Sequence, residues 1–164
     1  MAKKLEILIG DKLRDSGLRL AVAESCTGGL VGHRITNVPG SSTYYMGSVT
    51  AYAYEAKVRL LEVEWATLEQ HGAVSPETVE EMARGVRRAL AADIGISVSG
   101  IAGPGGGSRE KPIGLVWMGL SVSDSDWTRE YHFDGDRLTV KEQAAEEALR
   151  LGLDYLDGNL VKKD

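Results

Sequence analysis

Cysteine and histidine are scarce in this chain of 164 residues, which contains one Cys and three His. The single cysteine, Cys26, excludes an internal disulfide, so the sequence shows no requirement for an oxidising compartment. The histidines, His33, His71 and His132, are scattered along the chain. No pair of potential ligands has the close spacing of a zinc or di-iron site. We therefore expect no metal and no cofactor.

A basic excess and long apolar runs are also missing. The 19 Lys and Arg are outnumbered by 24 Asp and Glu, for a net charge of −5, which argues against a nucleic-acid partner because such proteins need a basic face. No stretch approaches the roughly 20 apolar residues of a membrane-spanning helix. The charged N-terminus does not resemble a signal peptide. We expect a cytoplasmic protein without a membrane partner, forming one domain over residues 1–164.

The hydrophobic periodicity of the sequence alternates between helix and strand. It predicts helices that begin near residues 5, 55, 76 and 138, and another that ends near residue 35. Apolar or alternating segments predict strands over residues 18–23, 47–53, 94–98, 115–122 and 127–133. The last two strands are expected to pair as a hairpin. This order predicts an α/β fold, a three-layer α/β/α sandwich with a mixed, mostly parallel sheet.

Ser25 stands where an apolar strand meets a predicted helix start, and it is followed by Thr27, Gly28 and Gly29. Free backbone N–H groups at a helix start can stabilise an oxyanion or bind a phosphate. The glycines would let a ligand approach the backbone closely. The residues alone leave two interpretations open, since Ser25 or Thr27 can also simply cap the helix.

A nucleophilic serine needs a base. The three histidines lie on predicted helices or strands without an obvious acidic partner, so a Ser-His-Asp triad is the weaker hypothesis. Lys57, just after the second strand, is an alternative base if burial lowers its pKa. Tyr52 would then link Ser25 to Lys57 by hydrogen bonds or shuttle the proton. Spacing alone favours an exposed lysine and an ordinary sheet tyrosine, since most lysines are exposed.

Five glycines occupy residues 100–108, directly after a predicted strand. Such a loop can present several N–H groups to an anion, although it matches neither a phosphate-binding Walker loop nor a dinucleotide fingerprint. It can equally be a flexible connection. Lys111, at its far end, would add a positive charge.

Ordered motifs along nearly the whole chain resemble one known family. The matching segments are residues 23–29, 38–42, 52–57, 71–75, 99–104, 111–114 and 135–137. On these segments the chain resembles the CinA C-terminal domain family of competence- and damage-inducible proteins, which includes stand-alone nicotinamide mononucleotide deamidases. Ser48 and Tyr54 depart from the family pattern, in which a glycine and a smaller polar residue are expected.

The resemblance implies an amidohydrolase that converts nicotinamide mononucleotide to nicotinate mononucleotide and ammonia, without a metal, in pyridine nucleotide recycling. It implies Ser25 as the nucleophile, with Tyr52 and Lys57 as its partners. We expect neutral Lys57, helped by Tyr52, to take the proton of Ser25, and N–H groups near Thr27 and Gly28 to receive the oxyanion.

The other substrate contacts are expected from Gly29, Ser41, Ser42, Gly105 and Arg137, the last four for the phosphate. As partners we expect the small-molecule substrate and a second copy of the chain in a homo-oligomer. Two alternatives remain open. The same site could act on another amide, or the chain could be a non-catalytic nucleotide-sensing or protein-binding module in competence or DNA-damage response.

Overall fold

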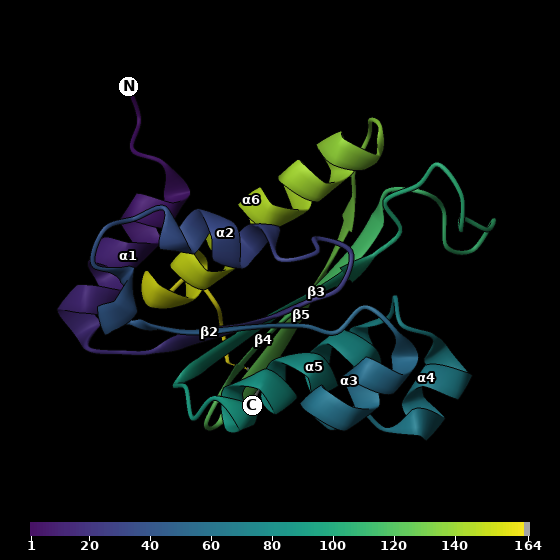
Figure 1. Ribbon diagram of the computed structural model, residues 1–164, viewed down its shortest axis with the longest axis horizontal. Helices are drawn as coiled ribbons and strands as arrows, with labels where there is room; N and C mark the ends of the chain where they lie inside the picture. The colour runs from purple at the N-terminus through teal and green to yellow at the C-terminus, as the bar shows by residue number, and fades with distance from the viewer. Residues whose placement is uncertain (163–164) are drawn as a thin grey trace.

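A five-stranded sheet forms the middle of the molecule, in a computed structural model that describes residues 1–162 (Figure 1). The strands lie in the order β2-β1-β3-β4-β5. Their bounds are β1 (Leu20–Glu24), β2 (Tyr45–Thr50), β3 (Ile94–Gly100), β4 (Leu115–Val122) and β5 (Ser125–His132). The two late strands form the predicted hairpin, with a turn at residues 123–124.

The sheet is mixed, as predicted. Strand β1 pairs in parallel with β2 and β3, whereas β4 runs antiparallel to both β3 and β5. Because β1, β2 and β3 are parallel, the segments that follow them emerge at the same edge of the sheet. Ligands of α/β proteins bind beyond this carboxyl edge. The edge therefore brings together residues 25–29, 51–53 and 101–106.

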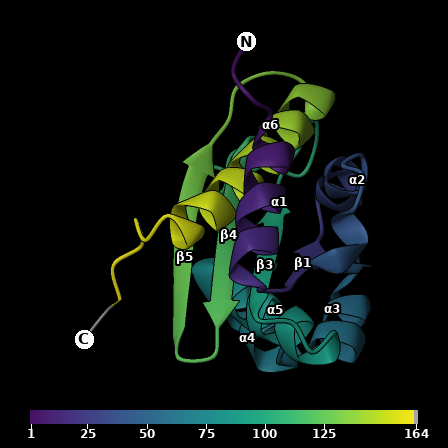
Figure 2. The ribbon, with the colours of Figure 1, turned by 90° about the vertical axis from the view of Figure 1, so that its left-hand side faces the viewer.

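Helices cover both faces of the sheet, which confirms the predicted three-layer sandwich (Figures 1 and 2). One layer contains α1 (Leu5–Ser16), α2 (Leu30–Thr36) and α6 (Arg137–Leu156). The opposite layer contains α3 (Tyr54–Leu61), α4 (Trp65–His71) and α5 (Pro76–Ala89). A short 3₁₀ turn, Ser41–Thr43, precedes β2. No helix within residues 1–162 is both long and apolar enough to cross a membrane.

The helix ends follow local sequence signals. Gly17 adopts the left-handed conformation (φ 71°) that ends α1, a conformation that glycine reaches without a steric penalty. The side chain of Ser75 accepts a hydrogen bond from the N–H of Thr78 at the start of α5, and Asp136 caps α6 in the same way through Thr139. These caps explain why both helices begin where the sequence predicts.

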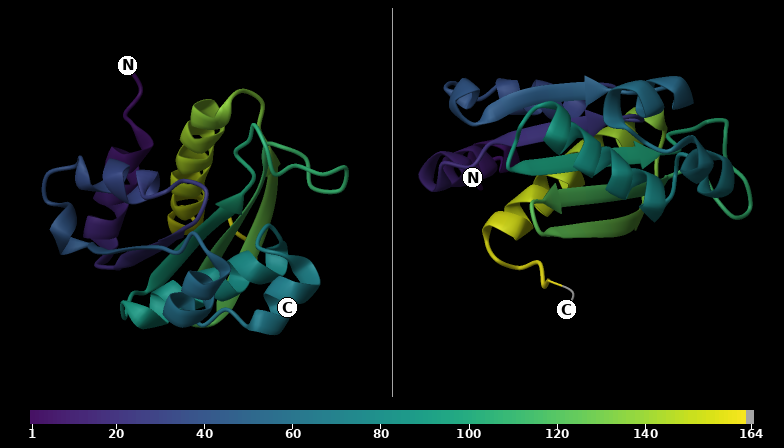
Figure 3. Two further views of the ribbon diagram at one scale, coloured as in Figure 1. Left: turned by 45° about the vertical axis from the view of Figure 1, so that its right-hand side comes forward. Right: turned by 90° about the horizontal axis from the view of Figure 1, so that it is seen from below.

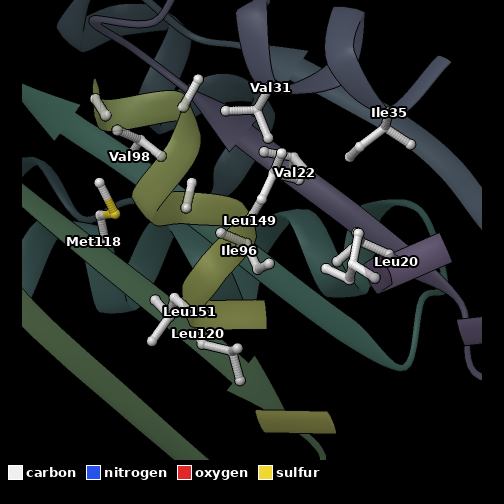
Figure 4. Close-up of a cluster of buried hydrophobic side chains, with 14 of the residues drawn as sticks. Leu20, Val22, Val31, Ile35, Ile96, Val98, Met118, Leu120, Leu149 and Leu151 are labelled. Carbon is white, nitrogen blue, oxygen red and sulfur yellow. The ribbon is translucent and has the colours of Figure 1, made fainter. Parts of the chain in front are cut away.

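Two apolar cores lie on opposite faces of the sheet. Figure 4 shows the larger one, in which Leu20 and Val22 of β1 and Ile96 of β3 face Leu149 and Leu151 of α6. The alternate residues of β1, Ala21 and Ala23, join Met82 and Val86 of α5 in the second core. All five residues of β1 are buried. Burial on both faces explains why this strand appears in the sequence as a continuous apolar run rather than an alternating one.

Helix α4 was not predicted. Its seven residues lack a capping hydrogen bond from the side chain of Glu64. Instead, the carboxylate of Glu81 on α5 accepts hydrogen bonds from the N–H of Glu64 (2.8 Å) and the hydroxyl of Thr67 (2.6 Å). The partner that stabilises this helix start is thus 14 to 17 residues away in sequence, beyond the reach of a local pattern.

Candidate functional site

The turn after β1 is organised by the buried carboxylate of Glu24. It accepts hydrogen bonds from the hydroxyl of Thr27 (2.6 Å) and from the N–H groups of Gly29 (3.0 Å), Val31 (3.1 Å) and Gly32 (2.9 Å). These N–H groups belong to the first turns of α2, where backbone donors have no partner within the helix. Glu24 therefore fixes the start of α2 and, with it, the position of the adjacent Ser25.

The ammonium group of Lys57 reaches the hydroxyl of Ser25 directly. Its Nζ lies 2.8 Å from Ser25 Oγ, 2.8 Å from the carbonyl oxygen of Ala51 and 3.1 Å from that of Tyr52. Ser25 follows β1, and Lys57 lies on α3, which follows β2. The parallel pairing of the two strands thus brings the serine and the lysine to one end of the sheet.

Burial changes the acid–base chemistry of Lys57. The residue is 1% exposed, and no carboxylate lies within salt-bridge distance of its Nζ among the described residues. Burial lowers the pKa of the Lys57 ammonium from its usual 10.5 to about 8, because the charged form loses its hydration. A substantial fraction of Lys57 is therefore neutral near physiological pH, as a base must be.

Tyr52 does not lie between Ser25 and Lys57, which corrects the expected link. Its side chain is 62% exposed, and its hydroxyl accepts a hydrogen bond from Arg137 Nη2 at 3.0 Å. Only the backbone carbonyl of Tyr52 contacts Lys57. The reason is geometric: the lysine side chain is long enough to reach Ser25 without an intermediary.

Ser25, Tyr52 and Lys57 open into a pocket of about 260 Å³ that also includes Gly105 and Arg137. The glycine-rich loop that follows β3 forms part of its lining, and Ala73 and Val74 form another part. Figure 3 shows the glycine-rich loop projecting from this edge of the sheet. Arg137 Nη1 donates to the carbonyl of Gly103 at 2.7 Å, so the guanidinium joins the loop to Tyr52 at the side of the pocket.

Thr27, Gly28 and Gly29 lie beside this pocket rather than in its lining. They border a neighbouring groove with Leu138 and Lys141. The N–H of Gly28 donates to the carbonyl of Ser25 and that of Gly29 to Glu24, so neither is free for an oxyanion. The N–H groups of Cys26 and Thr27 make no hydrogen bond within residues 1–162. Of these two, only Cys26 lines the pocket, so its N–H, rather than that of Gly28, is the available donor.

Ser41 and Ser42 are far from the pocket, which corrects their expected role as phosphate contacts within one chain. Both precede β2, whose first residue, Tyr45, pairs with Leu20. They therefore lie at the amino end of the parallel strands, whereas Ser25 follows the carboxyl end of β1. A strand of five residues spans about 17 Å. One phosphate group therefore cannot contact Ser41 and Ser42 as well as Gly105 and Arg137.

Other nucleophiles and bases do not compete at this site. Cys26 lines the pocket, but burial raises the pKa of its thiol to about 12, so the reactive thiolate is not populated. None of the histidines lines the pocket; His71 contacts Glu77, and His132 contacts Glu130. Across the described part of the chain, no three His, Cys, Asp or Glu side chains are grouped as metal ligands.

Two features of the site escaped the sequence interpretation. The structural role of Glu24 is signalled by an acid placed between an apolar strand and a glycine-rich helix start, a pattern that predicts a cap. The wall formed by Ala73 and Val74 has no such signal, because it depends on how the turn between α4 and α5 folds back. Lys111 donates to the carbonyl of His71, so its amine binds that turn and is not a free charge in the pocket.

The fold and the site together define a class: a three-layer α/β protein with a buried serine–lysine pair at the carboxyl ends of parallel strands. Known proteins share this architecture. The family profile described as "CinA C-terminal domain" matches residues 2–156. The chain therefore belongs to the CinA C-terminal domain family.

Individual relatives agree with this assignment. A CinA-like protein of Salinibacter ruber is 49% identical over 145 residues, covering 88% of this chain and 35% of the relative. A CinA-like protein of Desulfotalea psychrophila is 44% identical over 149 residues, covering 91% and 36%. The chain thus spans about a third of the length of these curated relatives.

Solved structures support the same family. The crystal structure of the competence damage-inducible protein A from Klebsiella pneumoniae has a TM-score of 0.90 and 35% identity, over 94% of this chain and 98% of that one. A competence or damage-inducible protein from Enterobacter asburiae has a TM-score of 0.89 and 37% identity, over 94% and 99%.

Proposed function

We propose that this domain hydrolyses the carboxamide of nicotinamide mononucleotide to nicotinate mononucleotide and ammonia, with Ser25 as the nucleophile and Lys57 as the base. The observation that carries the proposal is the 2.8 Å contact between Lys57 Nζ and Ser25 Oγ inside a pocket. A purely structural lysine would be paired with a carboxylate or exposed to water.

The hydrogen-bond arrangement around Lys57 suits a base. A neutral amine has two N–H donors and one lone pair. The carbonyls of Ala51 and Tyr52 can accept both N–H groups, which leaves the lone pair for the hydroxyl proton of Ser25. In this state Ser25 donates and Lys57 accepts, the direction needed to generate the nucleophile.

The reaction then has two stages. Lys57 takes the proton of Ser25 as Oγ bonds to the amide carbon, and the oxyanion is stabilised by the N–H of Cys26, a contribution of about 3 kcal/mol. Lys57 returns the proton to the amide nitrogen, and the C–N bond breaks to release ammonia. Water, deprotonated by Lys57, attacks the resulting ester, and the acid leaves as Ser25 regains its proton.

The dimensions and charge of the pocket support a mononucleotide. Its volume of about 260 Å³ lies just below the range of roughly 300 to 1,000 Å³ that is usual for ligand sites, which argues against a dinucleotide. Arg137 lies at the pocket side with a guanidinium suited to phosphate. We place the phosphate near Arg137 and Gly105, and the amide at Ser25.

The test is to incubate the purified domain with nicotinamide mononucleotide and a chelator, and to measure ammonia and the acid product. The proposal expects equimolar amounts of both. Free nicotinamide, nicotinamide adenine dinucleotide and asparagine serve as comparison amides. Release from another amide alone would keep the site but change the substrate. Binding of the mononucleotide without any turnover would favour a nucleotide-sensing module instead.

A further inference from the structure

The turn between α4 and α5, residues 71–74, forms one wall of the pocket but contributes no reactive group. Ala73 and Val74 line the pocket together with Ser25 and the glycine-rich loop. Gly72 has φ 76°, a left-handed conformation that side chains rarely adopt. The position of this wall is therefore set by what holds the turn.

Side chains from three elements bind the backbone of this turn. The carbonyl of Gly72 accepts hydrogen bonds from the hydroxyls of Ser75 (3.1 Å) and Thr78 (2.7 Å), at the start of α5. The N–H of Ala73 donates to the hydroxyl of Tyr54 at 3.3 Å. The carbonyl of His71 accepts from Lys111 Nζ. Three successive residues thus depend on side-chain partners.

Tyr54 connects the wall to the helix that carries the base. It is the first residue of α3, one turn before Lys57. Its ring packs edge-to-face on Trp65 of α4, with centroids 6.1 Å apart at 81°, so the hydroxyl is held in one direction. This tyrosine is a departure from the family pattern noted in the sequence, and its hydroxyl contacts the backbone of the wall.

Lys111 connects the same turn to the glycine-rich loop, the other pocket wall. It belongs to the loop segment in which the N–H of Ser108 donates to the carbonyl of Lys111 (2.8 Å) and the N–H of Lys111 to the hydroxyl of Ser108 (3.0 Å). Its ammonium lies against Gly72, where an added Cβ would come within 3.0 Å of Nζ. The lysine therefore spans from the glycine-rich loop to the turn.

We propose that Tyr54 and Lys111 are positioning residues that hold the two pocket walls at a fixed separation and thereby determine how tightly the pocket fits the aromatic ring of its amide substrate. The identity of that substrate rests on the proposed function. Neither side chain lines the pocket, so both act through the wall and not by contact with the reacting atoms.

Two conservative variants test the kinetic consequence. In Tyr54→Phe and Lys111→Met, KM for nicotinamide mononucleotide rises about fivefold, the change expected for losing one hydrogen bond. The turnover number stays within about twofold and its pH profile is unchanged, because Lys57 and Ser25 are not touched. Matched controls are Tyr44→Phe, whose hydroxyl has no partner within residues 1–162, and Lys12→Met, a surface lysine paired with Asp157; both keep the wild-type KM.

Amide hydrogen exchange tests the same inference without substrate. The N–H of Ala73 is expected to exchange about tenfold faster in Tyr54→Phe than in wild type and in Tyr44→Phe. If wild type does not hydrolyse the mononucleotide, the proposed function fails. The exchange result still shows whether Tyr54 holds the turn at residues 71–74 in place. The inference is overturned if Ala73 exchanges equally in Tyr54→Phe and wild type, or if the variants lower the turnover number at unchanged KM.

Discussion

Lys57 Nζ lies 2.8 Å from Ser25 Oγ, and the amine and the hydroxyl come from segments that follow two adjacent parallel strands. The amine makes all three of its hydrogen bonds to uncharged oxygens. A buried cation without a carboxylate partner is costly for a folded protein, and such an arrangement is typical of sites where the neutral amine is needed. The predictions below follow from this pair and from the residues that hold it.

The pair predicts how activity depends on pH. Since burial lowers the pKa of Lys57 to about 8, kcat/KM for the mononucleotide should rise with pH up to about 8 and then level off, as the amine loses its proton. Lys57→Arg should remove nearly all activity, because arginine stays protonated over this range. A pH–rate profile from pH 6 to 10 measures the effect. A flat wild-type profile would contradict a lysine base.

Folding stability should carry the same signature. The folded pKa of Lys57, about 8, lies below the usual 10.5, so between these values the unfolded chain binds more protons than the folded one. The contribution of Lys57 to the free energy of unfolding therefore rises with pH from about 8 to 10.5 and is constant outside this window. Urea denaturation at several pH values measures the free energy of unfolding of wild type and of Lys57→Met. The rise between pH values of about 8 and 10.5 should be present in wild type and absent from the variant.

Glu24 should stabilise both the fold and the site. Glu24→Ala removes the acceptor of four hydrogen bonds at the start of α2 and should lower the free energy of unfolding by about 2–4 kcal/mol. Glu24→Gln should also destabilise, because its amide would meet backbone donors. Exposed Glu110→Ala is the matched control for denaturation and activity. Wild-type stability in Glu24→Ala would show that the carboxylate is dispensable.

Tyr52→Phe tests whether the Tyr52 hydroxyl relays a proton between Ser25 and Lys57 or only binds Arg137. Because its hydroxyl contacts Arg137 and not Ser25 or Lys57, the variant should lose about tenfold or less in kcat/KM, the range expected for one hydrogen bond to a charged group. Lys57→Ala should lose far more. Steady-state kinetics of both variants, side by side, decide the matter. A loss in Tyr52→Phe as deep as in Lys57→Ala would place the hydroxyl in the proton path once substrate is bound.

The sequence predicts the sandwich well because most of its elements have local signals. Gly17, Ser75 and Asp136 mark helix ends, and the period of the apolar residues separates strands from helices. Helix α4 was missed because Glu81, on another helix, provides the acceptor at its start. The predicted end of β2 was too late because Ala51 and Tyr52 turn away from the sheet, where their carbonyls accept from Lys57.

The site was only partly predictable for a related reason. Residue type made Ser25 and Lys57 candidates and the family resemblance implied their pairing, whereas the parallel register of β1 and β2 is what brings them into contact. The same register separates Ser41 and Ser42 from the pocket, which a linear motif does not show. The sequence also does not show which N–H groups of the turn remain free. In the folded chain the N–H of Gly29 donates to the carboxylate of Glu24, and that of Gly28 donates to the carbonyl of Ser25.

Ammonia release by Ser25→Ala, measured beside its binding of nicotinamide mononucleotide, tests the assignment of the nucleophile most directly. The account predicts a loss of turnover of at least about 1,000-fold, a dissociation constant within a few-fold of the wild-type value, and an unchanged fold, since only one hydroxyl is removed. Full turnover by Ser25→Ala would show that the hydroxyl beside Lys57 does not attack the amide.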